Sequence, residues 1–285
     1  MDSYIIQNPE HLVILGYPIE HTASPLIHNY GFQYHKLDLV YTAMPIKHEN
    51  LPKLGKDFLR ILPIYGGNIT IPFKEIMFNC LDKFTDIASE VGAVNTFYRK
   101  NDQLWGDNTD VYGFVKSLEN NKEKIKNSRV IVFGTGGASK AIAKGLESLK
   151  ANVVIMVSRE YSKAKVFCDN YNLKYQTNKF IPADYNYFLD TQNLKNISAI
   201  VNTTPLGMYE VKSPISQELI NLTDRETLFY DLIYNPEKTL FLQLASNAGR
   251  EVQNGKQMLV YQAAKAFEIW TNKQLPVDEI LNLKF

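Results

Sequence analysis

The sequence predicts an α/β protein, because short apolar strands alternate with helices in two separate stretches of the chain. The first stretch begins with the apolar run "HLVILGY" (11–17), and a helical pattern, "SPLIHNYGFQYH" (24–35), follows it. The second opens with the strand "RVIVFG" (129–134), a glycine-rich turn, the helix "SKAIAKGLESLK" (139–150) and the strand "NVVIMVSR" (152–159). A strand, turn, helix and strand within about 30 residues form the parallel crossover unit of dinucleotide-binding domains.

The remaining elements follow from the same apolar patterns and turn signals. In chain order we expect strands at 39–46 and 66–73, a helix at "KEIMFNCLDKF" (74–84), a hairpin in 93–110, buried strands at 197–205 and 227–235, and a long helix at 255–272. Asn101-Asp102 supplies the turn of the hairpin. The polar segment "SLENNKEKIKNS" (117–128) is interpreted as a solvated helix end and a linker, so the domain boundary is expected there.

Composition narrows the class of protein. The 285 residues are 45% hydrophobic and 21% charged, and the net charge of +1 gives no reason to expect nucleic acid or a membrane surface as a partner. Cys80 and Cys168 lie far apart, without metal-ligand spacing or a disulfide framework, which favours a reduced, cytoplasmic setting and no metal. The N-terminus has no basic region followed by a long apolar core, so no signal peptide is expected.

The glycine-rich turn is the strongest binding signal in the chain. The turn comprises Gly134, Thr135, Gly136, Gly137, Ala138 and Ser139, between a strand and a helix. Gly134 permits a tight turn, and Gly136 lets the backbone approach a pyrophosphate, whose charge the helix dipole favours. Ser139 stands where the strict pattern has glycine, but a small residue still allows close helix–strand packing.

The end of the following strand should contact the adenosine ribose of a dinucleotide. Arg159 and Lys163 favour NADP, since a cation there accommodates the 2′-phosphate, and Ser158 precedes them. Glu160 would repel that phosphate if its side chain pointed inward, and a carboxylate at this place is typical of NAD sites. NADP is therefore the prediction, with NAD as the alternative and a purely solvated role for Glu160 and Lys163 as the simpler interpretation.

Polar side chains also cluster at strand ends in the first half of the chain. Thr22 and Ser24 precede a helix, where two hydroxyls suit a carboxylate, although an N-cap role is the simpler interpretation. The other clusters are Asn68, Thr70 and Lys74; Asn95; and Asn108, Thr109 and Asp110. Lys74 paired with Asp110 would be an acid/base group able to exchange a proton with an alcohol or carbonyl oxygen during hydride transfer.

Together these residues resemble the shikimate dehydrogenase family, whose members interconvert 3-dehydroshikimate and shikimate with a nicotinamide cofactor. The resemblance covers nearly the whole chain in eight motifs that occur in the family's order. They are "GYPIEHTASPLIHN" (16–29), "GGNITIPFKE" (66–75), "GAVNT" (92–96), "GDNTDVYG" (106–113), "GTGGAS" (134–139), "NTTPLGM" (202–208), "DLIYNPEKT" (231–239) and "NGKQMLVYQAAKAFEIW" (254–270).

The resemblance implies two domains around a cleft: an N-terminal α/β substrate domain with a mixed sheet, and a Rossmann-like domain. It implies a catalytic and substrate domain at 1–115, a dinucleotide domain at 116–240, and helices at 241–285 that return to the first domain.

The resemblance also implies roles for single residues. Lys74 would be the acid/base beside Asp110. The substrate ligands would be Thr22, Ser24, Thr70, Lys74, Asn95, Asp110, Tyr234 and Gln262, and the cofactor would contact residues 134–139, Ser158, Arg159, Lys163, Leu232 and Gly255. The implied partner is the small-molecule substrate, with the protein a monomer or homodimer.

Several positions depart from the family's pattern, and two of them, Lys256 and Gln257, replace small residues beside the nicotinamide region. Thr22 stands where serine is usual, and its methyl group could shift preference towards quinate. Glu160 replaces a smaller residue. Lys163 replaces an arginine, so a compact ammonium group takes the place of a planar guanidinium group.

The leading hypothesis is an NADP-dependent shikimate dehydrogenase. The alternatives are a dual quinate/shikimate dehydrogenase using NAD, and a ligand-binding regulator without catalysis.

Overall fold

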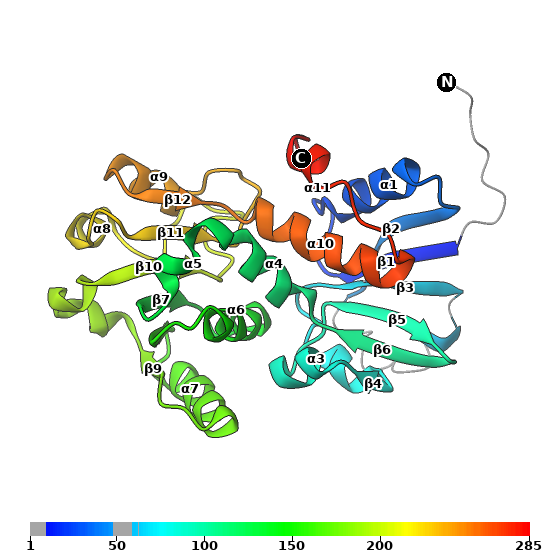
Figure 1. Cartoon of the computed structure of the whole chain (residues 1–285). Coiled ribbons are helices and arrows are strands. Elements are labelled where there is room, and N and C mark those ends of the chain that lie inside the picture. Colours follow the sequence, from blue (N-terminus) through cyan, green and yellow to red (C-terminus); the bar gives the residue numbers. More distant parts are fainter. Residues whose placement is uncertain (1–9, 48–58, 62) are drawn as a thin grey trace. The chain divides into compact units, whose positions relative to one another are not determined.

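The computed structural model describes residues 10–47, 59–61 and 63–285. The chain divides into two compact units, one formed by residues 1–113 with 260–285 and the other by residues 114–259 (Figure 1). The divisions fall inside two helices, α4 (Thr109–Ser117) and α10 (Lys256–Thr271). The last turns of α10 and the C-terminal helix α11 (Val277–Leu281) therefore belong to the same unit as the first part of the chain.

The first unit contains a mixed six-stranded sheet, in the order β2-β1-β3-β5-β6-β4. Its strands are β1 (Glu10–Gly16), β2 (Leu39–Pro45), β3 (Ile64–Ile69), β4 (Lys83–Phe84), β5 (Thr96–Lys100) and β6 (Gln103–Asp107). β1 pairs in parallel with β2 and β3, and α1 (Ser24–Tyr34) connects β1 to β2. β5 pairs antiparallel with both β3 and β6, which makes the sheet mixed, as predicted.

The β5–β6 hairpin has the turn that the sequence predicts. Asn101 and Asp102 both adopt left-handed conformations, with φ of 51° and 59°. Two consecutive left-handed residues are typical of the tight hairpin turn whose twist matches that of the strands, and Asn and Asp tolerate this conformation well. The hairpin places Thr96 opposite Asp107, next to the polar residues 95 and 108–110.

The helix predicted at 74–84 is wrong. Only a short 3₁₀-helix forms, η2 (Ile76–Cys80), and the chain then becomes extended in β4. Tertiary pairing overrides the local preference, because β4 runs parallel to β6 and the Asp82 carboxylate accepts a hydrogen bond from the Leu104 amide at 3.0 Å. A separate helix, α3 (Asp86–Val91), follows, with Thr85 as its N-cap. The third strand also begins earlier than predicted, at Ile64, and ends at Ile69.

The second unit contains six parallel strands, in the order β12-β11-β10-β7-β8-β9. The strands are β7 (Arg129–Phe133), β8 (Val153–Val157), β9 (Phe180–Ala183), β10 (Ile197–Asn202), β11 (Leu228–Asp231) and β12 (Glu251–Gln253). The connecting elements are α6 (Gly137–Ser148), α7 (Tyr161–Tyr175), η4 (Tyr185–Leu189), η5 (Thr191–Leu194), α8 (Gln217–Leu222) and α9 (Leu240–Asn247). This order is that of the dinucleotide-binding fold, with the direction of winding reversing between β7 and β10.

Both faces of this parallel sheet are buried. Val130 and Val132 point into one core, which α6 covers with Ile142 and Leu146. The residue between them, Ile131, points into a second core, and α8 and α9 cover that face. Successive side chains of one strand alternate between the two cores. These strands are therefore apolar throughout, since neither face of the sheet meets water.

The segment predicted as a linker is folded into the second unit. It contains η3 (Glu119–Asn121) and α5 (Lys122–Ile125), and Ile125 is fully buried in the first of the two cores. Lys124 Nζ lies 2.5 Å from Glu251 Oε2, and the Asn121 side-chain amide donates to the other oxygen of Glu251 at 2.9 Å. The lysines that suggested a solvated linker thus lie on the outer face of a packed segment.

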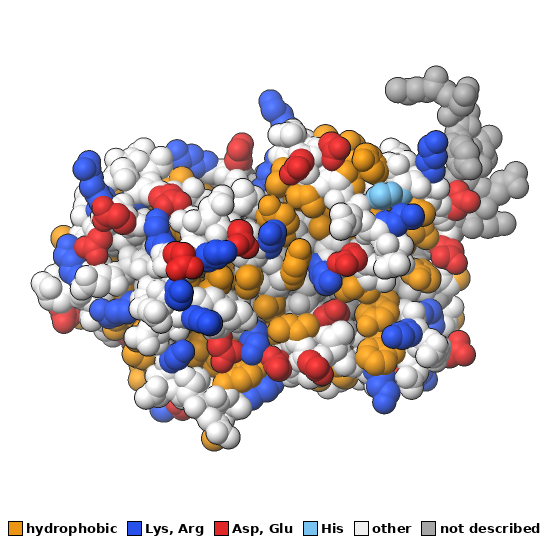
Figure 2. Space-filling model, viewed as in Figure 1, with side chains coloured by type: hydrophobic (Ala, Val, Ile, Leu, Met, Phe, Trp, Pro, Cys, Tyr) orange, Lys and Arg blue, Asp and Glu red, His pale blue; other side chains and the backbone are white. Residues whose placement is uncertain are grey.

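Charged side chains of both signs are intermixed over the face that Figure 2 shows, and no broad area of one sign stands out there. This pattern agrees with the net charge of +1. Within the described ranges, no helix has both the length and the apolar character that crossing a membrane requires.

Replacing Ile125 with alanine should lower the free energy of unfolding by about 2–5 kcal/mol, because the truncation leaves a cavity in the core. Urea-induced unfolding followed by circular dichroism measures the change. Lys126→Ala is the matched control, since the adjacent Lys126 side chain is 46% exposed, and should change this energy by less than about 0.5 kcal/mol. Equal effects of the two variants would contradict the packing of α5 into the core.

Candidate active site

Lys74 and Asp110 form an ion pair in the first unit, as the sequence predicts. Lys74 lies in the turn between β3 and η2, and Asp110 lies in the first turn of α4. Lys74 Nζ is 2.5 Å from Asp110 Oδ2, and the two side chains are 15% and 7% exposed. A largely buried lysine held by one carboxylate oxygen is fixed in position yet still reachable, which an acid/base group requires.

Asn95 determines how the Asp110 carboxylate is oriented. The Asn95 side-chain oxygen accepts a hydrogen bond from the Thr109 amide at 2.7 Å, which fixes the amide group so that its nitrogen faces Asp110. That nitrogen donates to Asp110 Oδ1 at 2.8 Å. Because Asn95 occupies Oδ1, the other oxygen of Asp110 is the one that receives Lys74.

Gln262 joins this group from a distant part of the sequence. Its side-chain oxygen accepts hydrogen bonds from Asn95 Nδ2 at 3.2 Å and from Thr109 Oγ1 at 3.3 Å. Gln262 lies on the part of α10 that belongs to the first unit and is only 8% exposed. Trp270, further along α10, donates its indole N–H to the Phe97 carbonyl at 3.1 Å and so holds the helix against β5.

Three predicted substrate ligands lie next to β3 and α1. Thr22 and Ser24 are at the start of α1, and Thr70 comes directly after β3. Thr22 Oγ1 donates to Ser24 Oγ at 3.2 Å, and Ala23, which has no capping side chain, occupies the N-cap position. The N-cap interpretation of the two hydroxyls is therefore wrong. Thr70 follows β3 directly, and a Cβ at Gly16 would lie 2.3 Å from its methyl group, so the close approach of these two turns requires glycine.

A buried chain of hydrogen bonds, which the sequence alone did not reveal, supports Asn95. Tyr41 donates its hydroxyl to the Asn68 side-chain oxygen at 2.6 Å, and the Asn68 amide donates to Thr96 Oγ1 at 3.0 Å. Thr96 in turn donates to Asn95 Oδ1 at 3.1 Å. From the sequence, Asn68 is only one member of a polar cluster. Its one signal is that an amide side chain interrupts an otherwise apolar strand.

His28 is the buried titratable group nearest in sequence to Ser24, one helical turn further along α1. Its ring is fully buried and stacks on Tyr41 with a centroid distance of 4.5 Å, and Trp270 lies 5.0 Å away. Among the residues that the structure describes, neither ring nitrogen has a hydrogen-bond partner. Burial lowers the pKa of His28 to about 3, although the nearby Asn68 amide acts in the opposite direction.

The glycine-rich turn lies at the carboxyl end of β7 in the second unit. Gly134 has a φ of 110°, and a Cβ there would lie 2.5 Å from Thr203 Oγ1, so this position requires glycine. A Cβ at Gly136 would meet no atom within 4 Å, so the backbone is open to a ligand there. No side chain caps the N-terminus of α6. Ser139 Oγ lies 2.6 Å from Oγ1 of Thr203, the residue that follows β10, and a glycine at 139 could not make this contact.

Ser158, Arg159, Glu160 and Lys163 follow β8, at the same edge of the sheet. Glu160 and Lys163 form an exposed ion pair, with Nζ 2.7 Å from Oε1 and side chains 60% and 61% exposed. The hydrogen bond from Lys163 and the charge of Arg159 lower the pKa of Glu160. Lys163 is thus engaged by Glu160 in this structure.

Leu232 and Gly255, both predicted to lie along the nicotinamide, are neighbours in the second unit. A Cβ at Gly255 would lie 2.0 Å from the Leu232 carbonyl oxygen, so only glycine permits this approach. Tyr234 follows two residues after Leu232, also in the second unit. Its contact with the substrate stays a prediction.

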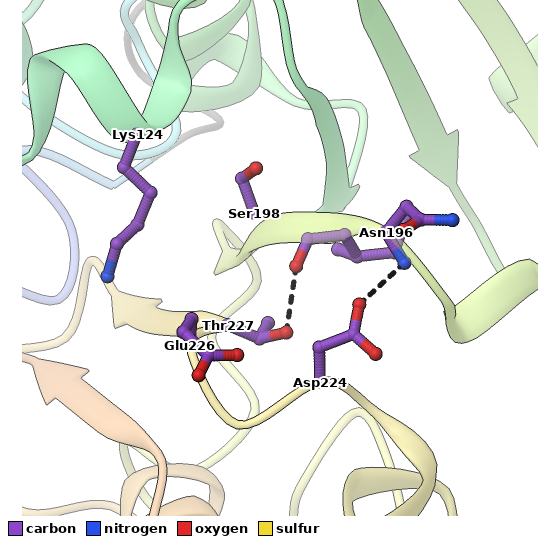
Figure 3. Close-up of a pocket in the computed structure, with 7 residues that line it drawn as sticks. Lys124, Asn196, Ser198, Asp224, Glu226 and Thr227 are labelled. Atoms are coloured by element: carbon purple, nitrogen blue, oxygen red, sulfur yellow. Dashed lines mark hydrogen bonds between the residues drawn. The ribbon is translucent and has the colours of Figure 1, made fainter.

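A polar pocket of about 270 Å³ lies at the opposite edge of the parallel sheet (Figure 3). Its lining residues are Lys124, Asn196, Ile197, Ser198, Asp224, Glu226 and Thr227. Thr227 Oγ1 donates to the Ile197 carbonyl at 2.7 Å, and the backbone amide of Asn196 donates to Asp224 Oδ2 at 2.7 Å. The pocket lies at the amino ends of β10 and β11, whereas ligands of open α/β sheets bind at the carboxyl ends.

Comparison with known proteins identifies the family. Residues 14–97 match the shikimate dehydrogenase substrate binding domain, and residues 255–283 match the shikimate 5′-dehydrogenase C-terminal domain. A shikimate dehydrogenase (NADP⁺) of Caldanaerobacter subterraneus subsp. tengcongensis is 38% identical over 267 residues, which cover 93% of this chain and 92% of that one. The chain belongs to the shikimate dehydrogenase family. The predicted family and fold class are thereby confirmed.

Two solved structures of the shikimate dehydrogenase family are similar to this chain over nearly its whole length. One is a shikimate dehydrogenase in complex with NADP⁺, which is 32% identical, has a TM-score of 0.86, and covers 96% of this chain and 94% of its own. The other is the Listeria monocytogenes shikimate 5-dehydrogenase in complex with shikimate and NAD, which is 30% identical, with a TM-score of 0.81 and 95% coverage of both chains.

His28→Phe should make the protein more resistant to acid. In the wild type, the pKa of about 3 in the folded state lies below the ordinary value of 6.5, so the unfolded chain binds the proton more tightly. Stability therefore falls as the pH drops below about 6.5, by about 1.4 kcal/mol per pH unit. Phenylalanine has no such group, so the variant should gain about 2 kcal/mol relative to wild type between pH 7.5 and pH 5.

Urea unfolding at the two pH values measures this difference. His11→Gln is the control, because His11 is exposed on β1 and its removal leaves the buried ring in place. If the difference between His28→Phe and wild type were the same at pH 7.5 and pH 5, the folded protein would bind a proton at His28 as readily as the unfolded chain does.

Proposed function

We propose that the protein catalyses the NADP-dependent, reversible reduction of 3-dehydroshikimate to shikimate, a step in the biosynthesis of chorismate and the aromatic amino acids. The observation that carries the proposal is the Lys74–Asp110 pair, held in place by Asn95 and Gln262 within a chain of this family. The glycine-rich turn at the carboxyl end of β7 supports the dinucleotide requirement.

Lys74 acts as the acid and base in this proposal. During reduction Lys74 Nζ donates a proton to the substrate's carbonyl oxygen, the C–O double bond becomes single, and a hydroxyl group forms. In the oxidative direction the Lys74 amine accepts that proton. The dinucleotide, when bound, supplies or receives the hydride at the adjacent carbon. Asp110 keeps the ammonium in position and balances its charge at 2.5 Å.

The other polar residues would bind and orient the substrate. Thr22 and Ser24 would donate hydrogen bonds to the substrate carboxylate, and Thr70, Asn95, Asp110 and Gln262 would bind the ring hydroxyls. Tyr234 would also contact the substrate. The dinucleotide would lie on residues 134–139, with Ser158, Arg159 and Lys163 at its ribose and 2′-phosphate, and Leu232 and Gly255 at its nicotinamide. The setting would be cytoplasmic, and the protein a monomer or homodimer.

Lys74→Ala should reduce kcat for shikimate oxidation by about 10²–10⁴, with KM changed much less, because the variant loses proton transfer but keeps the hydroxyl-binding groups. Absorbance of the reduced nicotinamide follows the reaction. The control is Lys83→Ala, an exposed lysine on β4 that takes no part in the site, and it should leave kcat unchanged. Near-wild-type turnover by Lys74→Ala would exclude Lys74 as the acid and base.

Glu160→Gln should shift cofactor preference further towards NADP. The substitution removes a negative charge and releases Lys163 for the 2′-phosphate. Because exposed ion pairs are weak, the expected rise in the ratio of kcat/KM for NADP over NAD is about two- to fivefold. Glu123→Gln is the matched control, since Glu123 forms a similar i,i+3 pair with Lys126 on α5. An unchanged ratio would mean that Glu160 points away from the ribose.

A second candidate function is that of a dual quinate/shikimate dehydrogenase that uses NAD. Thr22 and Glu160 are the reason to test it, because both depart from the family's pattern. Assays of the wild type with shikimate or quinate, and with NADP or NAD, distinguish the two functions. Activity confined to shikimate and NADP supports the biosynthetic reaction. Comparable rates with quinate and NAD would identify a dual-specificity enzyme instead, and the absence of turnover with every combination would favour a regulator.

A further inference from the structure

Asp231 is a buried carboxylate with no role in the proposed reaction. It ends β11 and is completely inaccessible to solvent. Burial raises its pKa to about 6, although hydrogen bonds act in the opposite direction. Within the described part of the chain, no lysine, arginine or histidine forms an ion pair with it, and its partners are all neutral donors. A buried charge without a cation is costly, so the presence of a carboxylate here calls for an explanation.

The carboxylate joins three segments at the carboxyl end of the parallel sheet. Asn202, at the end of β10, donates its side-chain amide to Asp231 Oδ1 at 3.0 Å. The Ile233 backbone amide donates to the same oxygen at 3.1 Å. Thr239, the N-cap of α9, donates its hydroxyl to Oδ2 at 2.6 Å. Asp231 therefore fixes both the beginning and the end of the segment 232–239.

Each of these partners holds a further part of the same edge. Asn202 Oδ1 accepts hydrogen bonds from the Thr204 amide at 3.0 Å and from the Thr204 hydroxyl at 2.6 Å, which orders the loop after β10. The Ile233 carbonyl accepts from the Gly255 amide at 3.1 Å, next to the start of α10. The loops after β10 and β11 and the start of α10 thus meet around one carboxylate.

A carboxylate fits this group of three hydrogen-bond donors better than a neutral side chain does. Its two oxygens accept several hydrogen bonds at once, and all three donors here point at them. An asparagine could keep the contact with Asn202 or Ile233 through its oxygen and could donate to Thr239 through its nitrogen. An alanine would leave all three donors without this acceptor in the core, and the segment 232–239 would lose both anchors.

We propose that Asp231 is a positioning residue for hydride transfer, which acts by fixing the segment 232–239 that carries Leu232 and Tyr234. The inference rests on the proposed function, in which Leu232 borders the nicotinamide and Tyr234 the substrate. Asp231 touches neither ligand in this proposal. Loss of its anchoring should therefore disturb the geometry of the reacting groups more than the binding of the pyrophosphate, which the separate turn at 134–139 would hold.

The test compares Asp231→Ala and Asp231→Asn with a structural control. Thr227→Val removes a buried hydrogen bond at the other end of the same strand, where Thr227 Oγ1 donates to the Ile197 carbonyl at 2.7 Å. The measurements are kcat, KM for shikimate and NADP, urea unfolding, and the primary kinetic isotope effect with deuterium at the transferred hydrogen. All assays are made well below the unfolding temperature of each variant.

Asp231→Ala should lower kcat by roughly 10- to 100-fold and raise the isotope effect on kcat, because misplaced groups make hydride transfer slower. KM for NADP should change little, and Asp231→Asn should recover most of kcat. Thr227→Val should lose stability while keeping the wild-type kcat and isotope effect. If Asp231→Ala does not fold, Thr239→Val removes one of the three donors, and a smaller fall in kcat with a raised isotope effect is expected.

Wild-type kcat and isotope effect in Asp231→Ala, or in Thr239→Val where Asp231→Ala does not fold, would overturn the positioning role, as would an equal kinetic loss in Thr227→Val. A wild-type protein that does not turn over shikimate with NADP would overturn the proposed function and this inference together. An active wild type with an unaffected Asp231→Ala variant would overturn the inference alone.

Discussion

The hydrogen bond from the Thr109 amide to the Asn95 side-chain oxygen is the constraint on which the candidate active site depends. It ties the start of α4 to the start of β5 and fixes which way the Asn95 amide faces. Asp110 can then receive Asn95 on one oxygen and Lys74 on the other. The same amide nitrogen contacts Gln262, so residues from three distant parts of the sequence depend on one orientation. The surrounding polar groups are buried and hydrogen-bonded, which makes this orientation costly to change.

The second unit obeys a different constraint, the burial of a parallel sheet on both faces. With helices on both sides, only the strand ends are left for binding, and the glycine-rich turn, the residues after β8, and the Leu232–Gly255 contact all lie at carboxyl ends. The polar pocket lies instead at the amino ends of β10 and β11. Chain direction distinguishes the two edges, because only the carboxyl ends lead into the amino termini of helices.

Much of this arrangement could be predicted from residues whose local conformation has few alternatives. Asn101-Asp102 specified its turn, and the run from Arg129 to Ser158 specified a crossover unit. The 3₁₀ segment at 76–80 and the packing of α5 could not be predicted, because pairing with β6 and burial of Ile125 are tertiary effects. Tyr41 and Thr96 were missed for another reason: as isolated residues they are typical of any strand, and only their hydrogen bonds give them a role.

The contact between Ser139 and Thr203 has a consequence for protein engineering. A hydroxyl at 139, a hydroxyl at 203 and the absence of a Cβ at 134 fit one another in a single small space. Grafting the turn of another dinucleotide-binding protein, with glycine at position 139, would remove the Ser139 hydroxyl from the Thr203 hydroxyl, which would keep only its hydrogen bond to the Phe133 carbonyl. The three positions therefore form one exchangeable module, and a chimaera that replaces residues 134–139 should replace position 203 as well.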